Sequence, residues 1–588
     1  MPIDSPSVSL AFRSQLDFEP LPFRIRVAVT GHRVLPDVES VRQIVHDSLR
    51  NWTPALFSAQ AQSKVQDVLA KGHTPLAYTI LSPLAEGADR VVAQAILELP
   101  AAQLEAVLPL SIDEYKKDFS STASLAEFDS LLALSARQLC LMTEDQKSSR
   151  AEPDSHARQL AYENVGRYVV NHCDLLLAVW DGGPSHGRGG TAEIVAYAQE
   201  QHIPVLHIWN GKAQLLNPDR FAPLDAEALC GLDRWNRASI HADRYADAFD
   251  AQEKSLFAPL PASKGESPQE PPLSAPVKQL VRTKMLTNYA RGSAIAESCR
   301  DRFQGGGWKI YSFSALAVFF AALGVVFGEW HIEVKEVPAA PFCYLFELVL
   351  LLVMVFMLKR THHAQTHPDW IENRFLTERI RCAAFLAICG VQAAPIEVPP
   401  FMGAQPVDRS WMARVLDEMW LRMPRLEPSS LGEVAPLRQY LSQRWLSDQI
   451  RYHHGKSARD NRMSLRFAAL GKIAVPTTMV VAALHFAMGL HEFAANGVRF
   501  VESAMTVLAL TLPAMAAALV GIETYREFRR LSVRSAMMEA RLEQLNRRLL
   551  SASTPEELFS LLRRIDKVML QETQDWMTLM RHVEIKAG

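Results

Sequence analysis

The sequence lacks the charge and cysteine patterns that mark several classes of protein. Its 588 residues carry 62 Lys and Arg against 64 Asp and Glu, a net charge of −2, so no basic field favours nucleic acid as a partner. The seven cysteines include no CxxC pair, and an odd number fits a reducing compartment better than a disulfide framework. Residues 1–20 lack a basic segment followed by an apolar core, so we predict no secretory signal and a cytoplasmic N-terminal half.

Familiar motifs for phosphate and metal binding are also missing. The glycine-rich stretch Asp174–Ala198 contains neither a Walker loop nor a GxGxxG fingerprint. No set of His, Cys and carboxylate residues has the spacing of a closed metal site. The histidines that lie closest together in the sequence are His362, His363, His367, His453 and His454. We expect these to be solvated polar residues, and we expect neither a metal nor a cofactor.

The second half of the chain contains four long apolar runs. Each covers roughly 17–21 residues, about the length needed to cross a hydrocarbon core of ~30 Å. They are Tyr311–Phe327, Phe342–Leu358, Leu470–Leu490 and Ser503–Ile522. A buried helical hairpin of a soluble protein is the alternative, but a soluble domain of this size does not need four such runs in two pairs. We therefore predict an all-α membrane domain with four transmembrane helices.

Basic residues flank these runs on one side of the predicted membrane. The short loops within the two pairs carry only Lys335 and Arg499, whereas the other flanks are strongly basic. The flanking residues are Arg300, Arg302, Lys309, Lys359, Arg360, Arg462, Arg466, Lys472, Arg526, Arg529, Arg530 and Arg534. By the positive-inside rule, the N-terminus, the insert 361–467 and the C-terminus are predicted to be cytoplasmic. Small residues such as Gly324 and Gly521 favour close packing of the helices.

The first part of the chain alternates short apolar segments with segments of helical spacing. The predicted strands are Ile25–Thr30, Ala77–Ser82, Leu104–Leu110, Leu175–Val179 and Pro204–Trp209. Strand–helix alternation predicts a Rossmann-like α/β fold with a mostly parallel sheet and helices on both faces. Ligands of such folds bind beyond the carboxyl ends of the strands.

Glycine-bearing loops follow three of these strands and form the candidate ligand site. Turn geometry explains one glycine at a strand end, but three such junctions with charged neighbours favour a site where backbone N–H groups face an anion. The candidate residues are Gly31, His32, Arg33, Gly87, Ala88, Asp89, Arg90, Trp180, Asp181, Gly182, Gly189, Gly190, Thr191 and Glu193. Asp89 has the alternative role of capping the helix that begins beside it.

Residue chemistry suggests a role for several of these side chains. Arg33 and Arg90 are predicted to bind phosphate, because a guanidinium group forms bidentate hydrogen bonds with it. Asp181 or Glu193 would accept hydrogen bonds from ribose hydroxyls. Trp180 would stack on a base. Packing in the core at the end of the strand explains this residue equally well.

Four segments taken together resemble the SLOG superfamily, the Rossmann-like group that contains the DprA/Smf proteins and the LOG phosphoribohydrolases. They are Val29–Arg33, Gly87–Arg90, Trp180–Gly182 and Gly189–Glu193, within Phe23–Trp209. The resemblance implies a nucleotide or nucleotide-derived ligand. The LOG enzymes carry a PGGxGTxxE motif, in which Arg and the terminal Glu assist cleavage of the N-glycosidic bond.

This chain departs from that motif, because Thr191 and Glu193 are one residue closer together than in the LOG enzymes. The departure favours sensing over catalysis. The enzymatic alternative is a membrane-tethered nucleotide N-glycosidase or phosphoribohydrolase that uses Glu193 or Asp181 as acid–base group or nucleophile.

The membrane half resembles SLATT domains, which are membrane effector modules associated with SLOG sensors in bacterial conflict systems. Arg374–Gly390 and Trp445–Asn461, next to the paired runs, carry this resemblance. It implies a homo-oligomeric sensor–effector of the bacterial inner membrane, in which a small nucleotide ligand triggers pore formation or disruption of the lipid bilayer in antiphage defence. A ligand-gated channel or transporter without a defence role is the remaining alternative.

These patterns divide the chain into seven segments. They are a leader 1–22, the SLOG-like domain 23–210, an extension and Pro-rich linker 211–280, a first transmembrane hairpin 281–360, the insert 361–467, a second transmembrane hairpin 468–525 and a helical tail 526–588. In the tail, Met538, Leu542, Leu545 and Leu549 have heptad spacing, which fits an intrachain hairpin or an intersubunit coiled coil.

Overall fold

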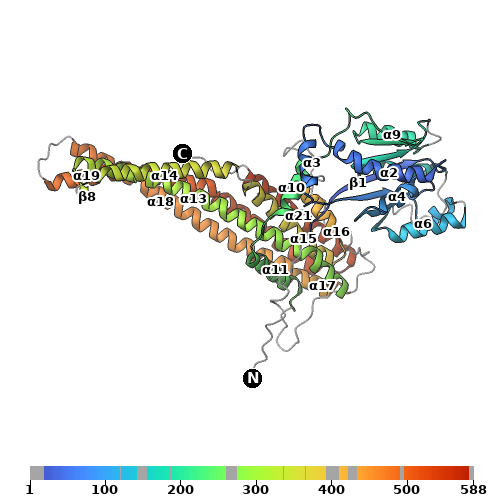
Figure 1. Ribbon diagram of the computed structural model, residues 1–588. Coiled ribbons are helices and arrows are strands. Elements are labelled where there is room, and N and C mark those ends of the chain that lie inside the picture. Colours follow the sequence, from blue (N-terminus) through green and yellow to red (C-terminus); the bar gives the residue numbers. More distant parts are fainter. Residues whose placement is uncertain are drawn as a thin grey trace, which may run out of the picture. The chain divides into compact units, whose positions relative to one another are not determined.

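The computed structural model describes residues 19–119, 121–141, 155–184, 188–259, 274–334, 337–363, 366–391, 410–420, 433–489 and 496–581. The chain forms two compact units (Figure 1). The Rossmann-like unit comprises Met1–Ala238 and Pro395–Met423, and the helical unit comprises Ser239–Ala394 and Pro424–Gly588. Most of the predicted leader and of the predicted Pro-rich linker lies outside the described residues.

The Rossmann-like unit is built on a seven-stranded sheet with the order β4-β3-β2-β1-β5-β6-β7. The strands are β1 (Phe23–Gly31), β2 (Leu76–Ser82), β3 (Gln103–Leu108), β4 (Arg137–Cys140), β5 (Leu175–Val179), β6 (Val205–Trp209) and β7 (Lys212–Leu216). Neighbouring strands are parallel except β6 and β7. The predicted α/β fold with a mostly parallel sheet is therefore confirmed.

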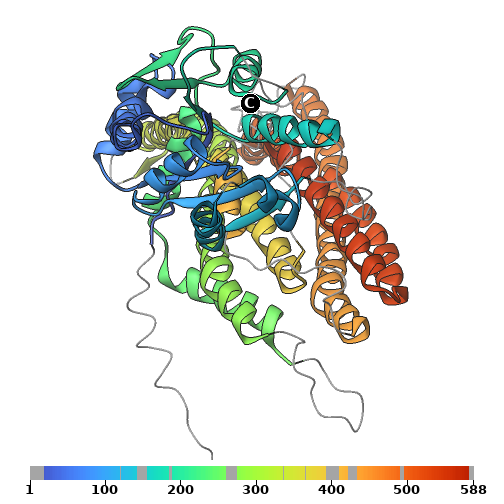
Figure 2. The same ribbon diagram turned by 90° about the vertical axis from the view of Figure 1, so that its right-hand side faces the viewer.

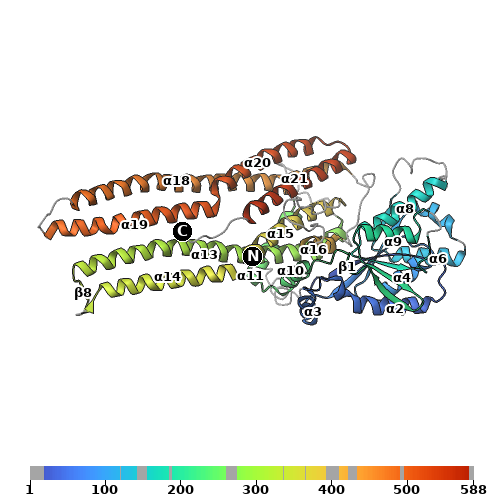
Figure 3. The same ribbon diagram turned by 90° about the horizontal axis from the view of Figure 1, so that it is seen from above.

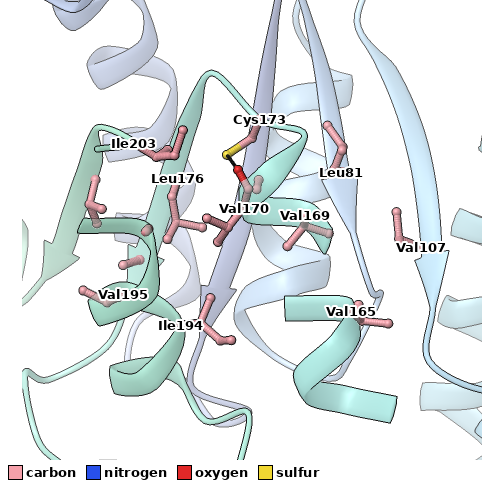
Figure 4. Close-up of a cluster of buried hydrophobic side chains, with 14 residues drawn as sticks. Leu81, Val107, Val165, Val169, Val170, Cys173, Leu176, Ile194, Val195 and Ile203 are labelled. Carbon is pink, nitrogen blue, oxygen red and sulfur yellow. Dashed lines mark hydrogen bonds between the residues drawn. The ribbon is translucent and has the colours of Figure 1, made fainter. Parts of the chain in front are cut away.

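Helices cover both faces of this sheet. The helices of this part of the chain are α2 (Val38–Trp52), α3 (Gln62–Ala70), α4 (Ala88–Leu97), α5 (Ile112–Tyr115), α6 (Thr122–Leu134), α8 (Ser155–Asn171), α9 (Thr191–Glu200) and α10 (Ala226–Arg237). Helices α8 and α9 lie on one face, and α2 and α4 pack together on the other (Figure 3). Val169 of α8 and Ile194 of α9 pack in one buried cluster with Leu176 of β5 (Figure 4). Burying side chains of this size contributes about 1.5–3 kcal/mol each.

The sequence did not predict the two edge strands, β4 and β7. Each has at most five residues, and neither is fully buried. A short edge strand therefore lacks the continuous apolar run that identifies the buried central strands.

A distant helix completes the Rossmann-like unit. Helix α16 (Trp411–Trp420) comes from the insert, yet Arg24 at the start of β1 forms two hydrogen bonds with the Glu418 carboxylate, at 2.7 and 2.9 Å. Arg414 of α16 pairs with Asp174, which precedes β5, at 3.4 Å. These contacts place α16 at the amino ends of the central strands, whereas the sequence predicts a single insert over 361–467.

In the helical unit, four helices of the described chain are long and apolar enough to span a membrane. The four predicted apolar runs lie in α13 (Thr287–Glu329), α14 (Ala340–His363), α18 (Ser447–Gly489) and α19 (Asn496–Arg526), and only Leu490 falls outside the described residues. Large apolar side chains point away from the protein: Leu352 is 60% exposed and Phe486 is 71% exposed. A lipid environment accounts for such surfaces, because large apolar patches are unfavourable in water.

Glycines let the membrane-capable helices approach one another closely. A Cβ atom on Gly324 of α13 would lie 2.6 Å from the ring of Tyr344 in α14. A Cβ atom on Gly521 of α19 would lie 2.4 Å from the ring of Tyr311 in α13. The tyrosine rings therefore fill the space that the missing side chains leave, as the small-residue pattern predicted.

The remaining helices of this unit are α11 (Ala242–Phe257), α12 (Ala275–Leu280), α15 (Thr366–Ile388), α17 (Val434–Leu441), α20 (Phe528–Ser551) and α21 (Pro555–Arg581). Helices α20 and α21, drawn in red, lie side by side (Figure 2). The predicted heptad residues Met538, Leu542, Leu545 and Leu549 are buried within the chain, since α20 packs on α18 and α21. An intrachain arrangement thus covers this seam.

Candidate functional site

The three glycine-bearing loops meet because their strands are neighbours in the sheet. Strand β1 lies between β2 and β5, and the carboxyl ends of these parallel strands share one edge. The His32 N–H donates to the Val179 carbonyl at 3.0 Å, which joins the first loop to β5. The Ala88 N–H donates to the His32 carbonyl, also at 3.0 Å, which joins the second loop to the first. The convergence predicted from the sequence is therefore present.

Two glycines make this close approach possible. A Cβ atom on Gly31 would lie 2.4 Å from the Val179 carbonyl oxygen and 2.5 Å from the Ala88 Cβ. Gly87 has a φ of +83°, and a Cβ atom on it would lie 2.3 Å from the Arg33 carbonyl oxygen. A side chain at either position would push the loops apart.

His32 and Asp181 link the first loop to the third. The Asp181 N–H donates to His32 Nε2 at 3.2 Å, and one carboxylate oxygen of Asp181 lies 3.2 Å from the same nitrogen. The Gly183 N–H donates to this carboxylate at 2.8 Å, and this hydrogen bond is the main cause of a lowered pKa for Asp181. Gly182 takes a φ of +84° in open space, which lets the loop turn. An exposed, ionised carboxylate thus sits at the rim of the site.

Arg33 is the exposed cation of the first loop. No carboxylate among the described residues lies within ion-pair distance of it. Its charge still acts on the loops, because it lowers the pKa of Asp89 against the effect of burial. Arg33 is therefore available to an external anion.

Arg90, by contrast, is directed into the protein. Its side chain is 1% exposed. It donates to the Leu84 carbonyl at 3.0 Å, to the carbonyl and hydroxyl oxygens of Ser124 at 2.9 Å each, and to Glu127 at 3.0 Å, and it lies 4.5 Å from the centre of the Phe119 ring. The sequence predicted Arg90 to bind phosphate, but these contacts give it the role of holding α4 to α6.

Asp89 is also buried, with 7% of the residue exposed. Its carboxylate accepts a hydrogen bond from the Ala85 N–H at 3.2 Å. Burial raises its pKa to about 7, although Ala85, Arg33 and Arg90 act in the opposite direction. The N-cap position of α4 is occupied by Gly87, so Asp89 fixes the preceding turn and does not cap the helix.

Trp180 packs against the unit at the end of β5. Its indole N–H donates to the Gly183 carbonyl at 3.0 Å, and its ring centre lies 4.7 Å from that of His207. The ring contacts the buried cluster on the α8 and α9 side of the sheet. Of the two roles considered for Trp180, base stacking and core packing, the contacts match core packing.

The fourth glycine segment opens α9. Gly189 has a φ of +74° and donates its N–H to the Glu193 carboxylate at 2.8 Å. Gly190 is the N-cap residue and Thr191 is the first residue of the helix. Glu193 therefore accepts from the N–H of the residue before the N-cap and ties the loop to the first turn of α9. Residues 185–187 lie outside the described part of this loop.

Sequence reasoning missed Glu163 of α8, which anchors this loop. Its buried carboxylate contacts both Arg188 and Arg167, and the hydrogen bond from Arg188 is the first cause of its lowered pKa. The spacing of Glu163 and Arg167 indicates only an ordinary pair on one helix turn. Nothing in the sequence connects Glu163 to a loop 25 residues away.

The assembled edge can attract an anion and hold a polyol beside it. The N-termini of α4 and α9 carry partial positive charge, and Arg33 adds a full charge, while Asp181 can accept hydrogen bonds from hydroxyl groups. Within the described residues, no group of three or more His, Cys, Asp or Glu side chains could hold a metal ion. A scan against protein-family models, a search of curated proteins and a search of solved structures each find no match to this chain.

Proposed function

We propose that this protein is a membrane-bound sensor in which the Rossmann-like unit binds a nucleotide-derived signal and the helical unit responds in the bilayer. One observation carries the proposal: the loops after β1, β2 and β5 meet at one edge, with Arg33 exposed there, in a chain that also has four membrane-capable helices. The phosphate would contact Arg33 and the helix N-termini, and Asp181 would accept a ribose hydroxyl.

The path of the chain supports coupling between the two units. It passes from one unit to the other after Ala238, after Ala394 and after Met423. The segment between Ala394 and Met423 contains α16, which contacts the amino ends of β1 and β5. The carboxyl ends of the same two strands carry the candidate site. A ligand changes the helical unit only by binding one state better than another.

The response that best fits the SLOG and SLATT resemblances is pore formation or membrane disruption by a homo-oligomer in antiphage defence. The basic flanks of the apolar runs support an inner-membrane protein with cytoplasmic N- and C-termini. The hydrolase alternative is less favoured, because Glu193 already accepts the Gly189 N–H at 2.8 Å. Released base after incubation of the full-length protein with NAD or AMP would instead establish that activity.

The binding step is tested with Arg33→Ala in the full-length protein. A panel of ATP, AMP, NAD, ADP-ribose and cyclic dinucleotides is titrated against protein in neutral detergent. Loss of a charge-assisted contact should raise the Kd of any bound nucleotide by about tenfold or more, which corresponds to about 1.4 kcal/mol.

Arg50→Ala is the matched control, since Arg50 is an exposed arginine near the other end of α2. It should leave the Kd unchanged. Equal binding by Arg33→Ala and the wild type would overturn the assignment of the site, and so would a wild type that binds no member of the panel.

A further inference from the structure

A cavity of about 510 Å³ lies inside the helical unit. Its walls come from α13, α15, α18, α19, α20 and α21. This volume is within the range of pockets that hold small molecules, about 300–1,000 Å³. Gln304 on its α13 wall precedes the apolar run at Tyr311 by seven residues, so it lies about 10 Å along the helix from the start of that run. The residues that line the cavity all lie outside the four apolar runs, on the side of their basic flanks.

Two arginines in the cavity wall have neutral partners. Arg374 donates to the Tyr452 hydroxyl at 2.9 Å, and its guanidinium lies 4.7 Å from the centre of the Trp576 ring. Arg526 donates to the Gln304 side-chain oxygen at 2.6 Å. Both arginines are half-buried. Among the described residues, neither guanidinium group has a carboxylate within ion-pair distance. Glu378 and Glu572 act on Arg374, and Asp460 acts on Arg526, only at longer range.

The other charges in the wall do not supply the missing counter-ion. Five basic and three acidic side chains line the cavity. Asp460 is paired with Lys456 at 2.9 Å, and Glu378 is paired with Arg381. Two of the three carboxylates are therefore already engaged by other cations, and the cavity is left with a surplus of positive charge.

The chain also bends at this cavity. Glu527 lies between the two lining residues Arg526 and Phe528, and it has a φ of +50° where α19 ends and α20 begins. The left-handed region is unfavourable for a residue with a side chain such as glutamate. A ligand in the cavity would contact both sides of this junction, as well as α13 and α18, which are two of the membrane-capable helices.

We propose that this cavity binds a phosphate-bearing anion with an apolar or ring-containing part, at a site separate from the loops of the Rossmann-like unit. The guanidinium groups of Arg374 and Arg526 would take the phosphate, since their planar donor sets match its oxygens. Aromatic side chains of the wall, among them Trp370 and Trp576, would contact the remainder of the ligand. Occupancy would favour one arrangement of the helices that meet there.

The phosphate can come from two sources, and two arms of one experiment distinguish them. In the first arm, full-length protein in phosphatidylcholine nanodiscs is titrated with pyrophosphate and with ATP. In the second arm, protein in neutral detergent is mixed with phosphatidylglycerol or with phosphatidylcholine, and retained lipid is measured by native mass spectrometry. We expect saturable binding in at least one arm, with preference for phosphatidylglycerol if the lipid is the source.

Arg374→Gln and Arg526→Gln should each weaken that binding about tenfold, and the double variant should abolish it. Arg451→Gln is the matched control, because Arg451 lies on α18, which contributes to the cavity wall, but its own side chain is 76% exposed and paired with Asp448. Arg374→Lys keeps the charge and should retain part of the affinity if the protein folds. The proposal is overturned if no probe binds in either arm, or if the folded double variant binds as the wild type does.

Discussion

Arg90→Ala is expected to destabilise the Rossmann-like unit by roughly 3–5 kcal/mol, a large part of the stability of a typical domain. The substitution removes hydrogen bonds to Leu84, Ser124 and Glu127 and leaves a void beside Phe119. Buried carbonyl groups then lose their donors, which costs more than the net strength of each hydrogen bond. Pulse proteolysis of the full-length protein in urea, with fragments identified by mass spectrometry, measures the effect unit by unit.

The neighbouring substitution Arg33→Ala provides the comparison. Because Arg33 is exposed, its removal should change the stability by no more than about 0.5 kcal/mol. The two substitutions therefore separate the proposed ligand contact of Arg33 from the structural contacts of Arg90. An Arg90→Ala protein that resists proteolysis to the same urea concentration as the wild type would show that this guanidinium is not needed for the fold.

Asp89→Asn is expected to stabilise the same unit by an amount that increases with pH from about 4 and is complete above about 7. The folded pKa of Asp89 is about 7 against 3.8 for the ordinary group, and burial is the main cause. A raised carboxyl pKa means that ionisation costs stability: the cost is absent below pH ~4, grows between pH ~4 and ~7 and is complete above that. Asn resembles the neutral carboxyl group in shape and can still accept from the Ala85 N–H.

The gain from Asp89→Asn should therefore be close to zero at pH 4 and should reach up to about 4 kcal/mol at pH 8.5, since each pKa unit corresponds to about 1.4 kcal/mol. Urea-dependent pulse proteolysis at the two pH values gives this difference directly. A gain of the same size at both pH values would contradict a titrating Asp89, and a loss at pH 8.5 would show that the charged form is needed by the fold.

The sequence was sufficient to predict the central strands, because each is an apolar run bounded by a turn. It was also sufficient to predict that loops after β1, β2 and β5 share one edge, since parallel strands have their carboxyl ends on the same side. The four membrane-capable helices followed from length and hydropathy alone. These features depend on residues that are close together in the sequence.

The direction of a side chain at the site could not be predicted in the same way. Arg33 and Arg90 occupy similar positions beside glycines, yet one is exposed and the other is buried. The difference comes from Ser124 and Glu127, which lie 34 and 37 residues beyond Arg90 and meet it only in the folded unit. Helix α16 was missed for the same reason, because its partners Arg24 and Asp174 lie 394 and 240 residues away from the residues they contact.

Dye release from liposomes tests whether a nucleotide at the β1, β2 and β5 loops controls the membrane helices. Full-length protein is reconstituted into liposomes that contain a self-quenching dye, and the nucleotides that bind the wild type are added. We expect dye release from liposomes that contain the wild type or Arg50→Ala, and no release from liposomes that contain Arg33→Ala. Equal release through Arg33→Ala, or no release with any nucleotide that the wild type binds, would contradict it.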